Sequence, residues 1–251
     1  MATNTGKKMF TILENNPEVM NALALKLGLS PTLTFHDIYS LSPADLTHIP
    51  RPALALLAII PLTPSWAADR TAEDAAGTGL AYHAADQPSP APIIWLKQTI
   101  GNACGSIGLV HCALNGPAAQ HVLPGSTLAQ LRDAAVPLAM EERAQMLHDS
   151  DEFEAAHKAV VELGDTAPPT VEGEANVGQH FVAFVKAEDG HLWELEGSRL
   201  GPIDRGELGA DEDVLSPRAL ELGLGRVIKL EEESGGGDLR FSCIALTTTE
   251  G

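Results

Sequence analysis

The sequence has little cysteine and no Cys-x-x-Cys pair. Its three cysteines, Cys104, Cys112 and Cys243, are spread over 251 residues. An odd and sparse set gives no disulfide framework, and the eight-residue spacing of the first two is not that of a zinc site. That spacing also places Cys104 and Cys112 too far apart on a helix to pair as a redox couple. We therefore expect no metal, and no cofactor is implied.

The chain is also poor in positive charge. It has 16 Lys and Arg against 34 Asp and Glu, which gives a formal net charge of −18. Such a chain lacks the basic surface that nucleic-acid binding needs. The charge permits attraction to a basic partner, and it equally fits the acidity that keeps many cytosolic proteins soluble.

Long apolar runs and internal repeats are missing as well. The longest run, residues 53–60, is too short to cross a bilayer, and the first eight residues contain no apolar signal region. We expect no membrane partner, a reducing cytoplasmic compartment, and a monomer. The length fits one large domain or two small ones and is ample for a substantial core, and the 44% hydrophobic content is ordinary for a globular protein.

Hydrophobic periodicity predicts both helices and strands, hence an α/β (α+β) fold. Asn16 and Pro17 open a helix that Gly28 closes, and Asp189-Gly190 marks a hairpin turn. Residues 63–91 have lost periodicity and are predicted to form a mobile surface insertion. Strands are expected at 9–13, 33–38, 53–60, 93–96, 179–186, 191–195 and 239–246, and helices at 17–27, 104–114, 126–136, 140–147, 153–163 and from 216 toward 233.

Cys104 stands between small residues at the predicted start of a helix. A helix N-terminus has free N–H groups and the positive end of the dipole, both of which stabilise a thiolate. Gln98, six residues earlier, carries a side-chain amide that could hold an oxyanion together with the backbone N–H of Cys104. Cys112 and Cys243 occupy apolar patterns and are predicted to be core residues.

A histidine and an acid lie on the two strands of the predicted hairpin. His180 is the second residue of the first strand, and the second strand leads into Trp193-Glu194-Leu195-Glu196-Gly197, which carries an acid. A carboxylate that accepts the Nδ1–H of His180 would leave Nε2 facing a thiol. Cys104, His180 and such an acid would then form a nucleophile, a base and an orienting group, with Gln98 as oxyanion donor.

These residues resemble the ubiquitin carboxyl-terminal hydrolase family of papain-like cysteine proteases. The segment KQTIGNACGSIGL at 97–109 is similar to the active-site signature of that family. Further segments in the same order are similar too, namely LENNPEVMN at 13–21, ALALLAIIPLT at 53–63, HFV at 180–182, DGHLWELEG at 189–197 and RFSCIAL at 240–246. The resemblance implies a single catalytic domain over residues 1–251, with a papain-like antiparallel sheet flanked by helices and a knotted chain.

The resemblance assigns roles to Cys104 as nucleophile, His180 as general base and acid, and Gln98 as oxyanion donor. The third family residue is an aspartate, and this chain has Glu196 in its place. Three interpretations stay open: Glu196 orients His180 after a small backbone shift, Asp189 or Asn176 takes its place, or the enzyme is weakened. We favour the first of these.

The implied substrate is ubiquitin, cleaved from small or extended adducts at its C-terminal glycine through an acyl-enzyme. The resemblance makes Glu14, Asn15 and Asp37 candidates for ubiquitin contact, and residues 149–169 a crossover loop that limits the leaving group. Each contact residue could equally be a cap or a solvated acid, and the loop could be an ordinary helix with a linker. Two alternatives remain: a preference for the ubiquitin-like modifier Nedd8, and a ubiquitin-binding protein whose triad fails.

Overall fold

A six-stranded antiparallel sheet forms the centre of the molecule. The computed structural model describes residues 8–77, 93–165, 178–235 and 238–249. The strands are β1 (Leu33–Ile38), β2 (Ala53–Pro61), β3 (Gln179–Lys186), β4 (His191–Leu195), β5 (Ile203–Glu207) and β6 (Ser242–Thr248). They lie in the order β1-β6-β2-β3-β4-β5, and every neighbouring pair is antiparallel. The apolar run that begins at Ala53 thus becomes an interior strand, buried along nearly its whole length.

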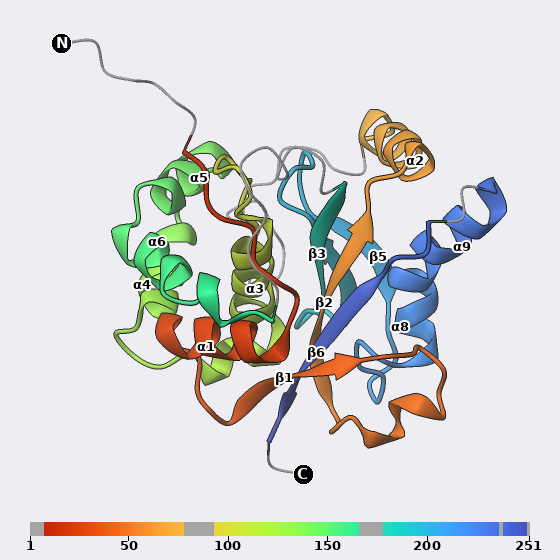
Figure 1. Ribbon diagram of the computed structural model, residues 1–251, viewed down its shortest axis with the longest axis horizontal. Coiled ribbons are helices and arrows are strands. Elements are labelled where there is room, and N and C mark those ends of the chain that lie inside the picture. Colours follow the sequence, from red (N-terminus) through yellow and green to blue (C-terminus); the bar gives the residue numbers. More distant parts are fainter. Residues whose placement is uncertain (1–7, 78–92, 166–177, 236–237, 250–251) are drawn as a thin grey trace.

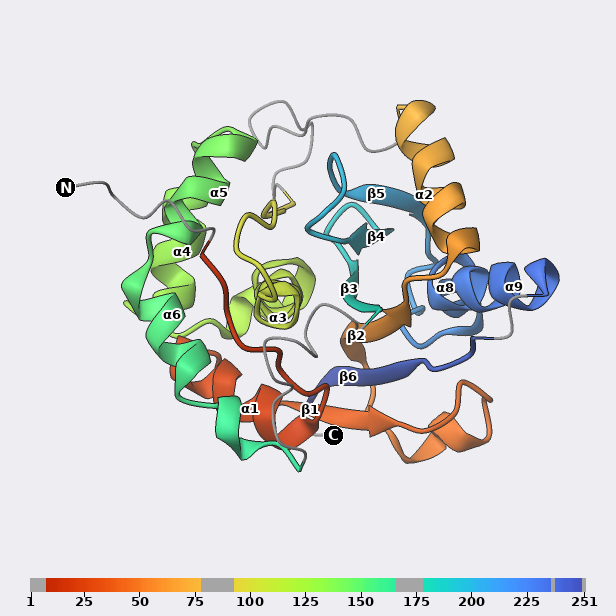
Figure 2. The ribbon, with the colours of Figure 1, turned by 45° about the horizontal axis from the view of Figure 1, so that its top comes forward.

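Helices cover both faces of this sheet (Figure 1 and Figure 2). One face carries α1 (Pro17–Leu27), α3 (Cys104–Leu114), α4 (Thr127–Ala135), α5 (Met140–His148) and α6 (Asp151–Lys158). The other carries α2 (Pro64–Ala75), α8 (Pro217–Leu222) and α9 (Leu224–Ser234). Short 3-10 turns lie at Asp45–His48, Gly116–His121 and Val161–Leu163. None of the helices in the described part of the chain is long and apolar enough to span a bilayer.

Helix α3 lies against the sheet and is buried from Gly105 to Leu114. Two glycines allow this close approach. A Cβ at Gly108 would lie 2.7 Å from Cδ1 of Leu57, and one at Gly105 would lie 3.2 Å from the ring of Phe181. The glycines that follow Cys104 therefore bring the start of α3 next to β3, where His180 lies.

Several local predictions are confirmed. Asn16 accepts a hydrogen bond from the N–H of Glu18 as the N-cap of α1, and Gly28 ends that helix in the left-handed region at φ 95°. Gly190 turns the β3–β4 hairpin at φ 83°. The mixed fold with an antiparallel sheet is the predicted one. The last helix, in contrast, is divided at Gly223 into α8 and α9.

The predicted insertion at 63–91 is wrong in its first part, because Pro64–Ala75 forms α2. Thr63 caps this helix by accepting from the N–H of Trp66, Pro64 occupies its first turn, and Trp66 alone is buried. Apart from Trp66, the helix consists mainly of alanines and of polar or charged residues. Its sequence therefore has no periodic apolar stripe that would predict a helix. Residues 78–91 of the predicted insertion lie outside the described part.

Two predicted strands are absent from the described residues. At 9–13 only an isolated bridge joins Met9 to Gly101. At 93–96 the backbone is bonded by side chains of α3 and its C-cap: the N–H of Ile94 donates to Asn115, and that of Leu96 donates to Nε2 of His111. Side-chain acceptors of this kind take the place of the hydrogen bonds that a neighbouring strand would make. The apolar pattern of the segment therefore predicted a strand that does not form.

Candidate active site

Cys104 is the first residue of α3 and is partly exposed. Its predicted helical position is therefore confirmed. The N–H groups of a first helical turn have no intrahelical acceptors, and they favour negative charge. A thiol at this place is both reachable from solvent and electrostatically prepared to ionise.

The thiol of Cys104 faces the imidazole of His180, the second residue of β3. Burial would raise the pKa of Cys104, but the hydrogen bond and charge of His180 and the N–H groups of Phe181 and Gly105 lower it below its usual value. Burial would likewise lower the pKa of His180, but its hydrogen bonds and charge interactions with Cys104 and Glu196 raise it to about 10. These opposite shifts favour a thiolate–imidazolium pair at neutral pH.

Glu196, directly after β4, completes the cluster and is fully buried. Its Oε1 lies 2.6 Å from Nε2 of His180, although the N–H bond does not point straight at the oxygen. The backbone N–H of Ser198 donates to the same Oε1 at 2.7 Å and its hydroxyl donates at 2.6 Å. Burial would raise the pKa of Glu196, but the hydrogen bond and charge of His180, the charge of Arg70 and the bond from Ser198 hold it at about 2.

The predicted assignment of the two ring nitrogens is wrong. Nε2 of His180, rather than Nδ1, contacts the carboxylate, so Nδ1 is the nitrogen left for the thiol. The strand alternation that places His180 says nothing about the rotation of its ring. The three side chains are nevertheless brought together.

Gln98 lies beside the residue that follows Glu196. Its backbone N–H donates to the carbonyl of Gly197 at 2.7 Å, and its side-chain amide donates to the carbonyl of Ile100 at 3.1 Å. A side-chain amide has two N–H bonds, so a second one remains for an oxyanion. Gly197 leaves little room for a side chain, since a Cβ would lie 3.1 Å from the Cβ of Gln98 and 3.2 Å from the carbonyl oxygen of Leu96.

Other acids do not replace Glu196 among the described residues. Asp189 is engaged in the hairpin turn, where its carboxylate accepts from the backbone of His191 and from the indole of Trp193. Asn176 lies outside the described residues. Of the predicted crossover loop at 149–169, the structure describes α6 and the turn Val161–Leu163, and residues 166–169 fall outside it.

The candidate substrate residues are tied to two places. Glu14 accepts from the N–H of Asp165 at 2.7 Å, just before the undescribed part of the crossover segment. Asn15 donates to the carbonyl and hydroxyl of Ser242 at 3.2 and 3.3 Å. Asp37, in β1, accepts from Tyr39, whose side chain is 84% exposed. These contacts neither require nor exclude binding, so the roles of the three residues stay predictions.

The remaining cysteines are core residues, as predicted. Cys112 is completely buried and burial raises its pKa strongly, while burial and then the charge of Asp37 raise the pKa of Cys243 to about 12. Within the described ranges, no group of three or more His, Cys, Asp or Glu is placed to hold a metal ion.

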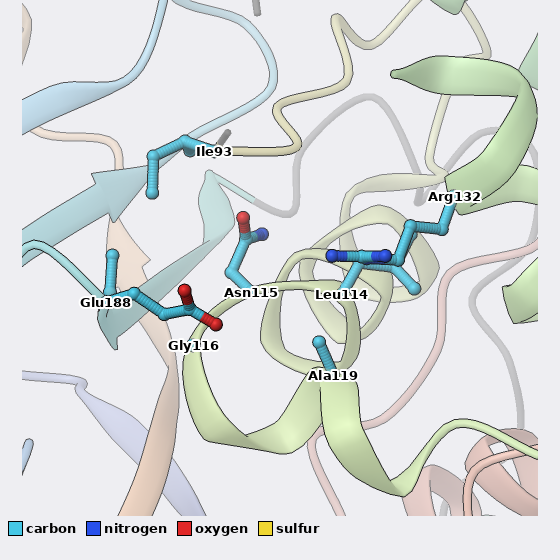
Figure 3. Close-up of a pocket in the computed structure, with 8 residues that line it drawn as sticks. Ile93, Leu114, Asn115, Gly116, Ala119, Arg132 and Glu188 are labelled. Atoms are coloured by element: carbon cyan, nitrogen blue, oxygen red, sulfur yellow. The ribbon is translucent and has the colours of Figure 1, made fainter. Parts of the chain in front are cut away.

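Neither of two further cavities contains the thiol. One, of about 10 Å³, has room for about one water molecule. The side chains of Asn115, Arg132 and Glu188 surround it beyond the C-terminal end of α3 (Figure 3). The other, of about 470 Å³, is largely apolar and lies between the Asp45–His48 turn and α8. The chemistry is therefore concentrated where α3, β3 and the end of β4 meet.

Sequence reasoning missed two groups at this place. Ser198 holds Oε1 of Glu196, and Arg70 of α2 brings its Nε to 3.4 Å from Oε2. The Ser198 contact follows from a local turn, for which its position two residues after Glu196 is a weak signal. Arg70 lies in the segment predicted to be an insertion, and nothing in the sequence pattern connects it to the acid.

A partly exposed thiol paired with a buried imidazole and a carboxylate defines a cysteine peptidase. The profile of the family described as "Ubiquitin carboxyl-terminal hydrolase, family 1" matches residues 10–224. The chain belongs to this family.

Relatives agree with this placement, and a solved structure shares the fold. The chain is 33% identical over 234 residues to ubiquitin carboxyl-terminal hydrolase isozyme L1 of Monodelphis domestica, covering 93% of this chain and 96% of the relative. It is 32% identical over 245 residues to ubiquitin carboxyl-terminal hydrolase 3 of Arabidopsis thaliana, with 97% and 96% covered. The Trichinella spiralis UCH37 catalytic domain bound to ubiquitin vinyl methyl ester has the same fold, with a TM-score of 0.69 at 20% identity, over 98% of this chain and 99% of that one.

Proposed function

We propose that this enzyme hydrolyses adducts from the C-terminal glycine of ubiquitin and is thus a deubiquitinase. The observation that carries the proposal is the Cys104–His180–Glu196 cluster in a member of the ubiquitin carboxyl-terminal hydrolase family. The names of its relatives, and the ubiquitin ester bound to a protein of the same fold, support ubiquitin as the substrate.

The first half of the proposed reaction is acylation. The Cys104 thiolate attacks the carbonyl carbon of the C-terminal glycine, and the negative oxygen is held by Gln98 and by the backbone N–H of Cys104. Protonated His180 then gives its proton to the departing amine. The bond to the leaving group breaks and a thioester to Cys104 remains.

The second half is deacylation by water. Neutral His180 removes a proton from a water molecule, which attacks the thioester and releases the ubiquitin carboxylate. Glu196 keeps the imidazole oriented through both halves, since its carboxylate is fixed by Ser198 and buried from solvent. A fixed base loses little free energy in reaching the reactive geometry.

The test is hydrolysis of a fluorogenic amide of ubiquitin by the parent enzyme and by Cys104→Ser. We expect turnover by the parent and none by the variant. The same amide of Nedd8 in parallel measures the preference between the two modifiers, and we expect ubiquitin to be the better substrate. Binding of ubiquitin without turnover by the parent would instead support a binding protein.

A further inference from the structure

Helix α2 reaches the active site through one side chain. Arg70 brings its Nε to 3.4 Å from Oε2 of Glu196 and donates through a terminal nitrogen to the carbonyl of Ser198. Its guanidinium carbon lies 5.2 Å from the centre of the Trp66 ring, which is itself buried. Arg70 is therefore held by an aromatic face, a carbonyl and a carboxylate at once, a geometry that a guanidinium suits better than an ammonium does.

The second oxygen of Glu196 gives this contact its importance. The ring of His180 and both the backbone N–H and the hydroxyl of Ser198 contact Oε1. In contrast, Oε2 is buried and makes no hydrogen bond within the described residues. Arg70 is the cation that faces it. A buried carboxylate oxygen without a partner is costly, so the nearby positive charge contributes to keeping Glu196 in place.

Charge balance leads to the same residue. With Cys104 as thiolate and His180 protonated, Cys104, His180 and Glu196 together carry one net negative charge. His111 of α3 also faces Glu196, but burial lowers its pKa to about 4, so it is neutral. Arg70 is then the charge that offsets the excess.

The rest of α2 is fixed by ion pairs that surround the loop after Glu196. Glu73 contacts Arg199 and Arg205, and Asp69 contacts Arg226 of α9 at 2.9 Å. Arg199 is buried in the loop that follows the acid, and Arg205, in β5, has a side chain that is only 7% exposed. This network holds α2 in register over the end of β4, so Arg70 cannot easily turn away.

We propose that Arg70 is a positioning residue that adapts this active site to glutamate. Glutamate is one methylene longer than the aspartate of the family pattern, so its carboxylate extends farther from the backbone of β4 and its second oxygen meets α2. Arg70 holds that oxygen while Oε1 faces His180. The inference rests on the proposed function for its substrate, but the contact it describes exists without one.

The experiment compares Arg70→Gln with the parent in hydrolysis of the ubiquitin amide across pH. Loss of the cation raises the pKa values of nearby acids, so the acid limb of kcat/KM should move to higher pH. We expect kcat to fall by about fivefold and KM to stay unchanged, since Arg70 acts on the chemical step. Arg70→Lys keeps the charge and should keep the acid limb at the parent position.

Two controls separate positioning from support of the fold. Arg226→Gln removes two other ion pairs of α2, with Asp69 and Glu73, without touching Glu196, and it should leave kcat and the acid limb unchanged. In a Glu196→Asp background the carboxylate no longer reaches Arg70, so Arg70→Gln should there have less than about a twofold effect, a coupling measured by the double-mutant cycle. Thermal melting of every variant reports the integrity of the fold.

Identical kcat and acid limb in Arg70→Gln and the parent would overturn the inference. Equal losses in Arg70→Gln and Arg226→Gln would also overturn it, because only support of α2 would then be involved. Alkylation of Cys104 by iodoacetamide across pH gives the same comparison without ubiquitin. If the parent failed to cleave the ubiquitin amide, the proposed function would fall, and the alkylation profile would still decide the role of Arg70.

Discussion

Oε1 of Glu196 lies 2.6 Å from Nε2 of His180, and the carboxylate is wholly shielded from solvent. The contact shows that the glutamate carboxylate reaches the imidazole ring of His180. It also leaves the other ring nitrogen for Cys104. The proposed chemistry depends on this geometry in ways that can be measured separately.

Removal of the acid should weaken the enzyme without abolishing it. In Glu196→Ala the imidazole loses its orienting contact, while the nucleophile and the oxyanion donors remain. We expect kcat/KM for the ubiquitin amide to fall by about 100-fold, or ~2.7 kcal/mol of transition-state stabilisation. Glu196→Gln, which keeps the shape and removes the charge, is the matched control. Full activity in Glu196→Ala would remove this residue from the site.

Loss of the amide of Gln98 should affect the transition state more than binding. Gln98→Ala removes one of the two proposed oxyanion donors, a change that lowers kcat in related chemistry by about 10²- to 10³-fold. We expect kcat to fall by that order and KM for the ubiquitin amide to change little. Steady-state kinetics measure both. A rise in KM at constant kcat would show that Gln98 binds substrate and does not stabilise an oxyanion.

The pH dependence of kcat/KM should be bell-shaped, and its alkaline limb should lie at a higher pH than the ordinary pKa of a histidine would give. Activity needs the thiolate of Cys104, whose pKa is lowered, so it should already be present below the ordinary thiol range. It also needs protonated His180, whose pKa of about 10 is raised, so activity should be lost only as pH rises through about 10. Alkylation rates of Cys104 give an independent profile. A single acid limb near the ordinary thiol pKa would contradict the ion pair.

Association with ubiquitin should be slowed by salt. The chain carries a net charge of −18, and opposite charge on a partner accelerates encounter in a manner that salt screens. Stopped-flow binding with Cys104→Ala should show an association rate that falls about tenfold between ~20 and ~500 mM NaCl. An association rate that does not depend on salt would rule out steering.

The residue Asp37 offers a local version of this test. Asp37→Asn and Glu221→Gln each remove one negative charge. Asp37 lies in β1, whereas Glu221 lies at an exposed position of α8, in the helical layer that also contains α2 and α9. We expect Asp37→Asn to weaken ubiquitin binding, measured by titration calorimetry, and Glu221→Gln to leave it unchanged. Equal affinities for both variants would show that Asp37 lies outside the contact.

Local sequence signals predicted much of this fold because the residues that begin or end a helix or a hairpin act on their immediate neighbours in the chain. Asn16, Pro17 and Gly28 mark both ends of α1, and Gly190 marks the hairpin. The segment at 93–96 shows the limit of such signals. It has the apolar pattern of a strand, yet its N–H groups bond to Asn115 and His111, a fact that depends on tertiary packing.

The candidate site divides in the same way. The helix start at Cys104, the strand of His180 and an acid on the paired strand follow from patterns visible in the sequence, and the resemblance to the family selects Glu196 as that acid. The ring orientation of His180 and the contact of Arg70 with Glu196 do not, because they depend on side-chain rotation and on the docking of α2. Helix α2 buries a single residue, Trp66. The sequence therefore has no apolar pattern that would predict this helix or the way it docks on the sheet.

The most direct test of the account is covalent capture by ubiquitin that carries an electrophile at its C-terminus. Intact-mass and peptide analysis of the parent enzyme should show one ubiquitin joined to Cys104, and Cys104→Ala should show none. Cys112 and Cys243 are buried and should stay unlabelled. An absence of adduct in the parent, or an adduct on either of those two cysteines, would contradict Cys104 as the nucleophile of a ubiquitin hydrolase.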